Sequence, residues 1–105
     1  MGAKSASPQA VFCERLRAAR AAAGLSQREL GIRAGLDEFV ASARVNRYEQ
    51  GVHQPDLDTA GRLAKVLDVP LAYLFADDER LAKAILGFAR LHRGEKDAVL
   101  RDLFP

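Results

Sequence analysis

Polar and basic side chains are concentrated in a short segment near the middle of this 105-residue chain, between residues 42 and 50. If the segment is helical, Val45 and Tyr48, three residues apart, face inward and the polar residues remain outside. Arginine pairs bidentately with guanine in the major groove of DNA, and asparagine or glutamine pairs with adenine. We therefore predict that a helix in this segment reads bases, and the candidate contacts are Ser42, Arg44, Asn46, Arg47 and Gln50.

A second set of candidate residues could bind phosphate. Gln27 and Arg28 follow Ser26, which forms with Glu29 the spacing of a capping box and so predicts that a helix begins at Gln27. Because free N–H groups at a helix start favour phosphate, we expect Gln27 and Arg28 to add affinity rather than specificity. His53 follows the segment of residues 42–50, and it either contacts a phosphate or is simply solvated.

The sequence gives little support for catalysis or metal binding. His53 and His92 are isolated, and no phosphate-binding loop or metal-ligand spacing occurs. The single cysteine, Cys13, excludes an intramolecular disulfide and a cysteine-cluster metal site, and it suits a reducing cytosol. No apolar run approaches the roughly 20 residues that span a bilayer, and the start does not have the pattern of a signal peptide. We therefore expect a cytoplasmic protein that is not an enzyme, with no catalytic residues, metal, cofactor or membrane partner, and the residues identify no small-molecule effector.

Two short helices joined by a tight corner must position the candidate residues. The first is predicted to begin at Gln27. Gly31 in its interior costs roughly 1 kcal/mol relative to alanine, and the usual reason to accept this cost is that another backbone comes close. Gly35 suits the left-handed residue that follows a helix end. The second helix is then predicted to run from Ser42 to a terminal glycine, Gly51.

The flanking segments also have helical patterns. A first helix is expected at residues 8–23, a fourth at 56–67 and a fifth at 71–75, followed by two C-terminal helices at 78–92 and 95–104 that are broken at Gly94. The predicted fold class is all-α. We expect a flexible tail at residues 1–7, a five-helix domain at 8–76, and a C-terminal helical extension at 77–105 that adds one or two helices.

Two motifs resemble one known family. The chain contains R-x-x-x-G-L-S-Q-x-x-L and then V-N-R-Y-E-x-G with a proline soon after, which is similar to the lambda-repressor-like (Cro-type, XRE) helix-turn-helix family over residues 12–76. The resemblance implies a sequence-specific regulator of transcription that binds double-stranded DNA, with repression as the expected role. It also implies that Gln27 touches a phosphate, and that Arg20 and Glu49 form a partly buried ion pair between the first helix and the recognition helix.

The chain departs from the family pattern at two places. Gly35 and Glu49 are fourteen residues apart, about four more than the usual helix-turn-helix spacing in this family, so residues 37–41 contain an insertion. The family also tends to place a lysine or arginine just after the second glycine, where this chain has Val52 and His53. We expect the insertion to affect the register of the recognition helix.

These departures keep an alternative open, a protein-interaction module that uses the same fold without binding DNA. Asp37 and Glu38 place negative charge beside the recognition helix. The net charge is +2, and residues 1–53 hold eight lysines and arginines against five acidic residues, which is a modest excess. The two functions differ in their salt dependence, because binding to DNA weakens steeply with salt whereas a hydrophobic contact does not.

The C-terminal extension has two interpretations. Its apolar residues form one stripe on each expected helix: Leu81, Ile85 and Phe88, then Val99, Leu100, Leu103 and Phe104. These stripes either cap the same core or form a dimer interface. We expect a homodimer, because a single module of this size binds DNA weakly and a dimer reads two half-sites.

Overall fold

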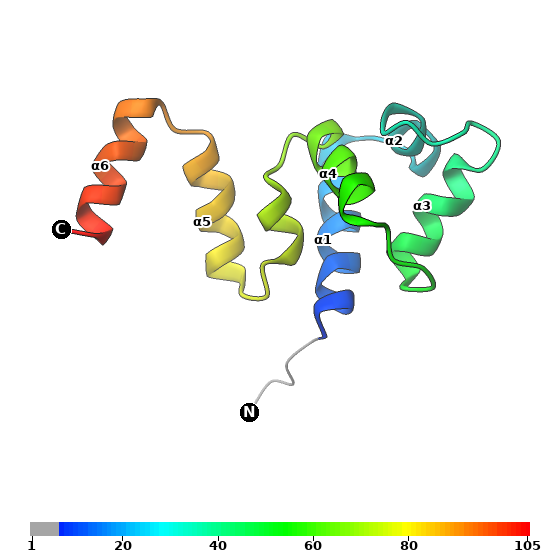
Figure 1. Cartoon of the computed structure of the whole chain (residues 1–105), viewed down its shortest axis with the longest axis horizontal. Helices are drawn as coiled ribbons and strands as arrows, with labels where there is room; N and C mark the ends of the chain where they lie inside the picture. The colour runs from blue at the N-terminus through cyan, green and yellow to red at the C-terminus, as the bar shows by residue number, and fades with distance from the viewer. Residues whose placement is uncertain (1–6) are drawn as a thin grey trace.

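A computed structural model describes residues 7–105, and all regular secondary structure in this part of the chain is helical (Figure 1). The elements in order are α1 (Pro8–Ala23), α2 (Gln27–Arg33), α3 (Ala41–Gln50), α4 (Leu57–Val66), the 3-10 helix η1 (Leu71–Phe75), α5 (Glu79–Ala89) and α6 (Arg93–Leu103). The predicted all-α class is confirmed. The expectation of a flexible tail falls on residues 1–6, outside the described residues, except for Ser7, which caps α1.

Three helices begin where their capping residues predict. The Ser7 hydroxyl accepts a hydrogen bond from a backbone N–H three residues later. At α2 both halves of the capping box form: the Ser26 hydroxyl accepts from the Glu29 N–H at 3.0 Å, and the Glu29 carboxylate accepts from the Ser26 N–H at 2.9 Å. Asp56 caps α4 by accepting from the Thr59 N–H at 2.7 Å, and this bond lowers the pKa of Asp56.

The recognition helix begins one residue earlier than predicted. Its first residue is Ala41 rather than Ser42, and the residue before it, Val40, makes no side-chain cap. The reason is packing against α2, because Ala41 is fully buried and lies against Gly31. A methyl group added at Gly31 would lie 2.8 Å from the Ala41 side chain. The close helix crossing predicted from Gly31 is therefore present, and it places Ala41 inside the helix.

The break between the two C-terminal helices was predicted at the wrong place. Gly94 does not separate them but lies in the first turn of α6, and the break falls at residues 90–92. Glu95 explains the difference, since its carboxylate accepts from the His92 N–H at 2.8 Å and starts the helix at Arg93. Near a helix start, the conformational freedom of Gly94 is less costly than in the interior.

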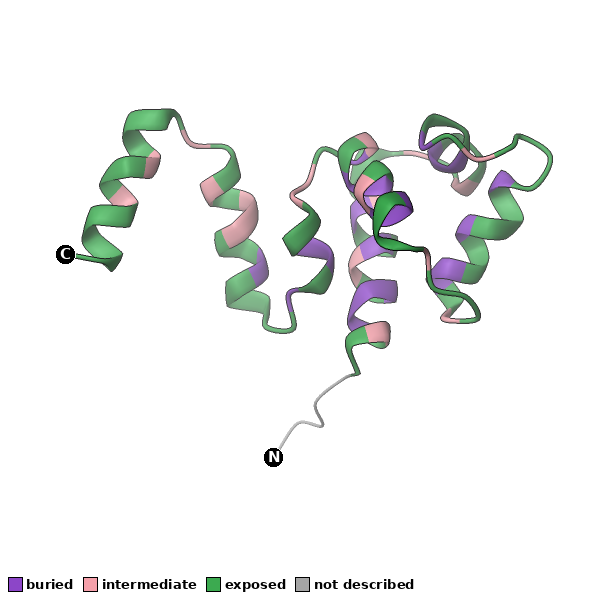
Figure 2. Ribbon diagram, viewed as in Figure 1, coloured by how far each residue is buried: buried purple, intermediate pink, exposed green. Residues whose placement is uncertain are grey.

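One core joins the first five elements. Each of them contributes one fully buried large side chain, and these are Leu16 from α1, Leu30 from α2, Val45 from α3, Leu63 from α4 and Leu74 from η1. Figure 2 shows the buried residues gathered where these elements meet, and the outer faces are exposed. Ala82 of α5 belongs to the same buried cluster, so the core is not confined to the domain predicted at residues 8–76.

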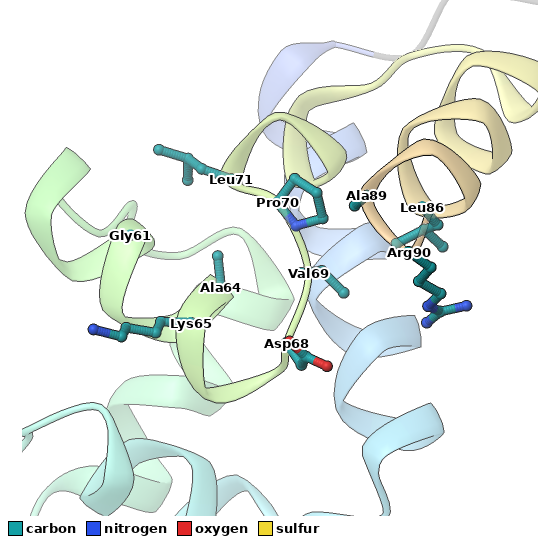
Figure 3. A pocket seen from close by; sticks show the side chains of 10 residues that line it. All are labelled: Gly61, Ala64, Lys65, Asp68, Val69, Pro70, Leu71, Leu86, Ala89 and Arg90. Carbon is teal, nitrogen blue, oxygen red and sulfur yellow. The ribbon is translucent and has the colours of Figure 1, made fainter. Parts of the chain in front are cut away.

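The last two helices add little to this core. α5 packs against η1 and buries only Ala82, and no residue of α6 is buried. A hollow of about 640 Å³ separates α4 from α5, with Pro70 between the side chains of the two helices (Figure 3). α6 lies at the far end of the molecule, whose longest extent is 50 Å. Among the helices of residues 7–105, none is long and apolar enough to cross a membrane.

Candidate nucleic-acid interface

The exposed side of α3 carries the predicted base-reading residues. Val45 and Tyr48 face inward as predicted, and Ala41 and Glu49 are buried beside them. The remaining residues of the helix are exposed, and they are Ser42, Ala43, Arg44, Asn46, Arg47 and Gln50. Apart from the small Ala43, every one of them carries a hydrogen-bonding group. This is a surface suited to the edges of base pairs.

Arg44 and Arg47 share a hollow between α3 and the segment that follows it. The Arg44 guanidinium donates to the Tyr48 hydroxyl at 2.8 Å and lies over the Tyr48 ring, 5.8 Å from its centre. Together with Arg47, His53 and Gln54 these residues line an open hollow of about 270 Å³. The structure thus brings two predicted base readers, Arg44 and Arg47, next to His53, the predicted phosphate contact.

Asn46 is held by a residue of the preceding helix. The side-chain amide of Gln27 donates to the Asn46 side-chain oxygen at 3.1 Å and to the Glu49 carboxylate at 3.1 Å. Gln27 therefore orients Asn46 and links the first turn of α2 to the middle of α3. Sequence reasoning assigned Gln27 to phosphate alone, and it missed this contact because no local pattern relates positions 27 and 46.

An ion pair joins α1 to α3. Arg20 donates through Nε and Nη2 to the two carboxylate oxygens of Glu49, the second contact being 3.0 Å, and its Nη1 donates to the Leu25 carbonyl at 3.1 Å. Glu49 is only 2% exposed, whereas the Arg20 side chain is 20% exposed. Its hydrogen bond to Glu49 raises the pKa of Arg20 above its usual value. The pair has the planar, forked geometry that arginine and carboxylate groups favour.

Three side chains of α1 also bind the carbonyl end of α3. Gln9 donates to the Gly51 carbonyl at 2.7 Å, the Cys13 thiol to the Tyr48 carbonyl at 3.1 Å, and Arg17 to the Glu49 carbonyl at 3.2 Å. The last carbonyls of a helix have no partner inside it, so these bonds complete its C-terminal end. Burial raises the pKa of the Cys13 thiol, which keeps it in the neutral form that donates this bond. Sequence reasoning did not identify this clamp.

Arg28 and His53, two predicted phosphate contacts, lie on the surface. Arg28 pairs with Glu38 of the inserted loop at 3.4 Å, and both side chains are more than half exposed. Exposed pairs of this kind contribute little stability, so Arg28 can exchange Glu38 for another anion at small cost. His53 is exposed at the hollow that it shares with Arg47.

Comparisons with known proteins agree on one family. Residues 16–74, more than half of the chain, match the helix-turn-helix family model. The chain is 32% identical over 96 residues to the cryptic phage CTXphi transcriptional repressor RstR of Vibrio cholerae, covering 85% of this chain and 81% of that protein. It also resembles the crystal structure of the transcriptional regulator BswR, with a TM-score of 0.81 and 45% identity over 87% of this chain and 90% of that one. The chain therefore belongs to the XRE helix-turn-helix family, whose members are DNA-binding regulators of transcription rather than enzymes.

Proposed function

We propose that the chain is a transcriptional repressor that binds a specific double-stranded DNA sequence by inserting α3 in the major groove. The observation that carries the proposal is the contrast between the two sides of this helix. Its buried side is fixed by Val45, Tyr48 and the Arg20–Glu49 pair, and its exposed side is polar and basic apart from the small Ala43. The similarity to a protein named as a repressor supports the repressing role.

The contacts divide into two groups. Base edges are read by the exposed side of α3, that is by Ser42, Arg44, Asn46, Arg47 and Gln50. Phosphates are contacted by residues outside α3, namely Gln27 and Arg28 on α2 and His53 after α3. The Gln27 bond to Asn46 gives Gln27 a second role, because a phosphate contact that fixes Gln27 also fixes a base reader.

We further propose that the protein acts as a homodimer through α5 and α6. An apolar hollow of about 390 Å³ lies between these helices and is lined by side chains that include Ile85, Phe88, Val99 and Leu103. Leu81 is 49% exposed, Leu103 is 65% exposed and Phe104 is 77% exposed. A second copy that covered these residues would bury apolar surface and would present two recognition helices to a symmetric site.

The test is selection of bound sequences from a random duplex pool with the purified full-length chain, followed by affinity measurements at several salt concentrations. We expect one enriched motif with two related half-sites. The logarithm of the binding constant should fall linearly with the logarithm of the salt concentration, with a slope of about −0.9 for each phosphate neutralised. A pool without enrichment, combined with binding that does not depend on salt, would favour the protein-interaction module instead.

A further inference from the structure

The loop between α2 and α3 presents an apolar side chain beside the recognition helix. Phe39 is 90% exposed, more than any other large apolar side chain in the described part of the chain, and its neighbour Val40 is 41% exposed. The loop belongs to the insertion that distinguishes this chain from the usual family spacing, and in Figure 1 it forms the outer corner between α2 and α3. Packing in the core does not explain why Phe39 is present, because its side chain is almost fully exposed.

Hydrogen bonds fix the position of this loop. The Asp37 carboxylate accepts from the Phe39 N–H at 2.8 Å, and the Asp37 carbonyl accepts from the Val40 N–H at 3.1 Å. Ala41 then anchors the end of the loop against Gly31. Phe39 is therefore held in the solvent by a closed turn rather than by a freely moving segment.

The loop leads directly into the N-terminal end of α3, next to the first predicted base reader, Ser42. The Val40 carbonyl accepts from the Arg44 N–H at 2.8 Å, which is the first helical hydrogen bond of α3. Phe39 lies outside the helix, two residues before Ala41, and the neighbouring Glu38 pairs with Arg28, a proposed phosphate contact of α2. Ala43, in the first turn of α3, is small and exposed, so it leaves room for an aromatic ring beside that end of the helix.

The two acidic side chains of the loop are exposed, and each has a partner within the protein. The Asp37 carboxylate is engaged with the Phe39 N–H, and the Glu38 carboxylate pairs with Arg28. Phe39 is thus the group that the loop offers to a ligand at the N-terminal end of α3. A phosphate would gain nothing from it. In the major groove the one apolar group on the base edges is the C5-methyl of thymine.

We propose that Phe39 is a specificity-determining residue that contacts a thymine methyl group at the edge of each half-site. This inference rests on the proposed function and adds a contact that the polar residues of α3 do not provide. The inserted loop then extends the sequence that is read by the recognition helix toward its N-terminal side. The methyl group, rather than a hydrogen-bonding pattern, identifies the base at that position.

The experiment replaces each thymine of the selected site in turn by deoxyuridine, which lacks only the methyl group. One replacement per half-site should weaken binding of the parent chain about fourfold, the factor that corresponds to burial of one methyl-sized group. F39A should bind the thymine site more weakly than the parent and should no longer respond to this replacement. L57A is the matched control, because Leu57 is a 71% exposed leucine on α4, and it should keep the parent response.

Each other outcome contradicts the proposal. An enriched site whose deoxyuridine scan is the same for the parent and F39A would overturn the role of Phe39 and leave the proposed function intact. A selected site without thymine at that edge would do the same. A pool without any enriched sequence would overturn both. Because Phe39 is exposed, F39A should have the same melting temperature as the parent chain. A loss of the response to deoxyuridine can then not be attributed to unfolding.

Discussion

Replacing Arg20 by alanine should expose how strongly the recognition helix depends on one ion pair. Glu49 is 2% exposed, and both of its carboxylate oxygens accept from Arg20. After the replacement, Gln27 would be the one remaining side-chain donor that the structure shows for this buried charge. The Leu25 carbonyl would lose its bond to Arg20 as well.

The expected cost follows from the burial of the two partners. Removing one partner of a buried pair costs about 3–5 kcal/mol, and we expect the lower part of this range for R20A because water can enter where Arg20 was 20% exposed. For a domain of this size, about 3 kcal/mol lowers the melting temperature by roughly 12 °C or more. E49A should cost less, since the arginine that it leaves behind reaches solvent and keeps its bond to Leu25.

Urea denaturation and thermal melts of the two variants measure these differences. R28A is the control, because it breaks the exposed pair with Glu38 and should change stability by less than about 1 kcal/mol. The double replacement R20M/E49L should recover much of the loss, since a buried pair can be exchanged for apolar side chains. Melting temperatures that fall equally in R20A and R28A would show that the pair does not hold α3 in place.

Three further predictions concern assembly, DNA recognition and the buried thiol. Removal of residues 92–105, which include α6, should give a folded monomer by sedimentation velocity, because Ala82 of α5 stays to cover the core; a full-length chain that is already monomeric at micromolar concentration would refute the proposed dimer. R44A should cost about 1–3 kcal/mol on the preferred DNA site and relax one base position, whereas R28A should weaken all sequences alike and lower the salt slope by about one; equal effects on specific and random DNA in both variants would contradict the division of roles. Since burial raises the pKa of Cys13, the only thiol of the chain, iodoacetamide should modify it slowly at neutral pH until urea unfolds the protein, and equal rates in the folded and unfolded chain would contradict the packing of α1 on α3.

Local chemistry determined which features could be predicted from the sequence. Ser26 with Glu29, and Asp56 before α4, bind backbone groups three residues away, so the pattern alone locates these helix starts. Ala41 begins α3 because of its contact with Gly31, and the sequence indicated the close crossing but not the residue that enters it. Gly94 was predicted to break the helix because glycine is unfavourable inside a helix. The hydrogen bond from the His92 N–H to Glu95 instead starts α6 at Arg93, before Gly94.

The candidate site shows the same division. The inward positions of Val45 and Tyr48 follow from helical periodicity, and the exposed side of α3 consists of the residues that this periodicity leaves outside. The bond from Gln27 to Asn46 and the clamp of Gln9, Cys13 and Arg17 join residues that are nineteen or more positions apart. Such contacts depend on how the helices cross, and a pattern within one helix carries no information about them.

The clamp at the end of α3 also affects how freely this protein can change its target. Gln9, Cys13 and Arg17 bind backbone carbonyls, which are present whatever side chains α3 carries. The exposed residues of the helix are therefore free to vary without loosening its attachment to α1. Natural variants, or libraries built on these positions, can explore new operators while the melting temperature stays nearly constant, so recognition in this fold is separable from stability.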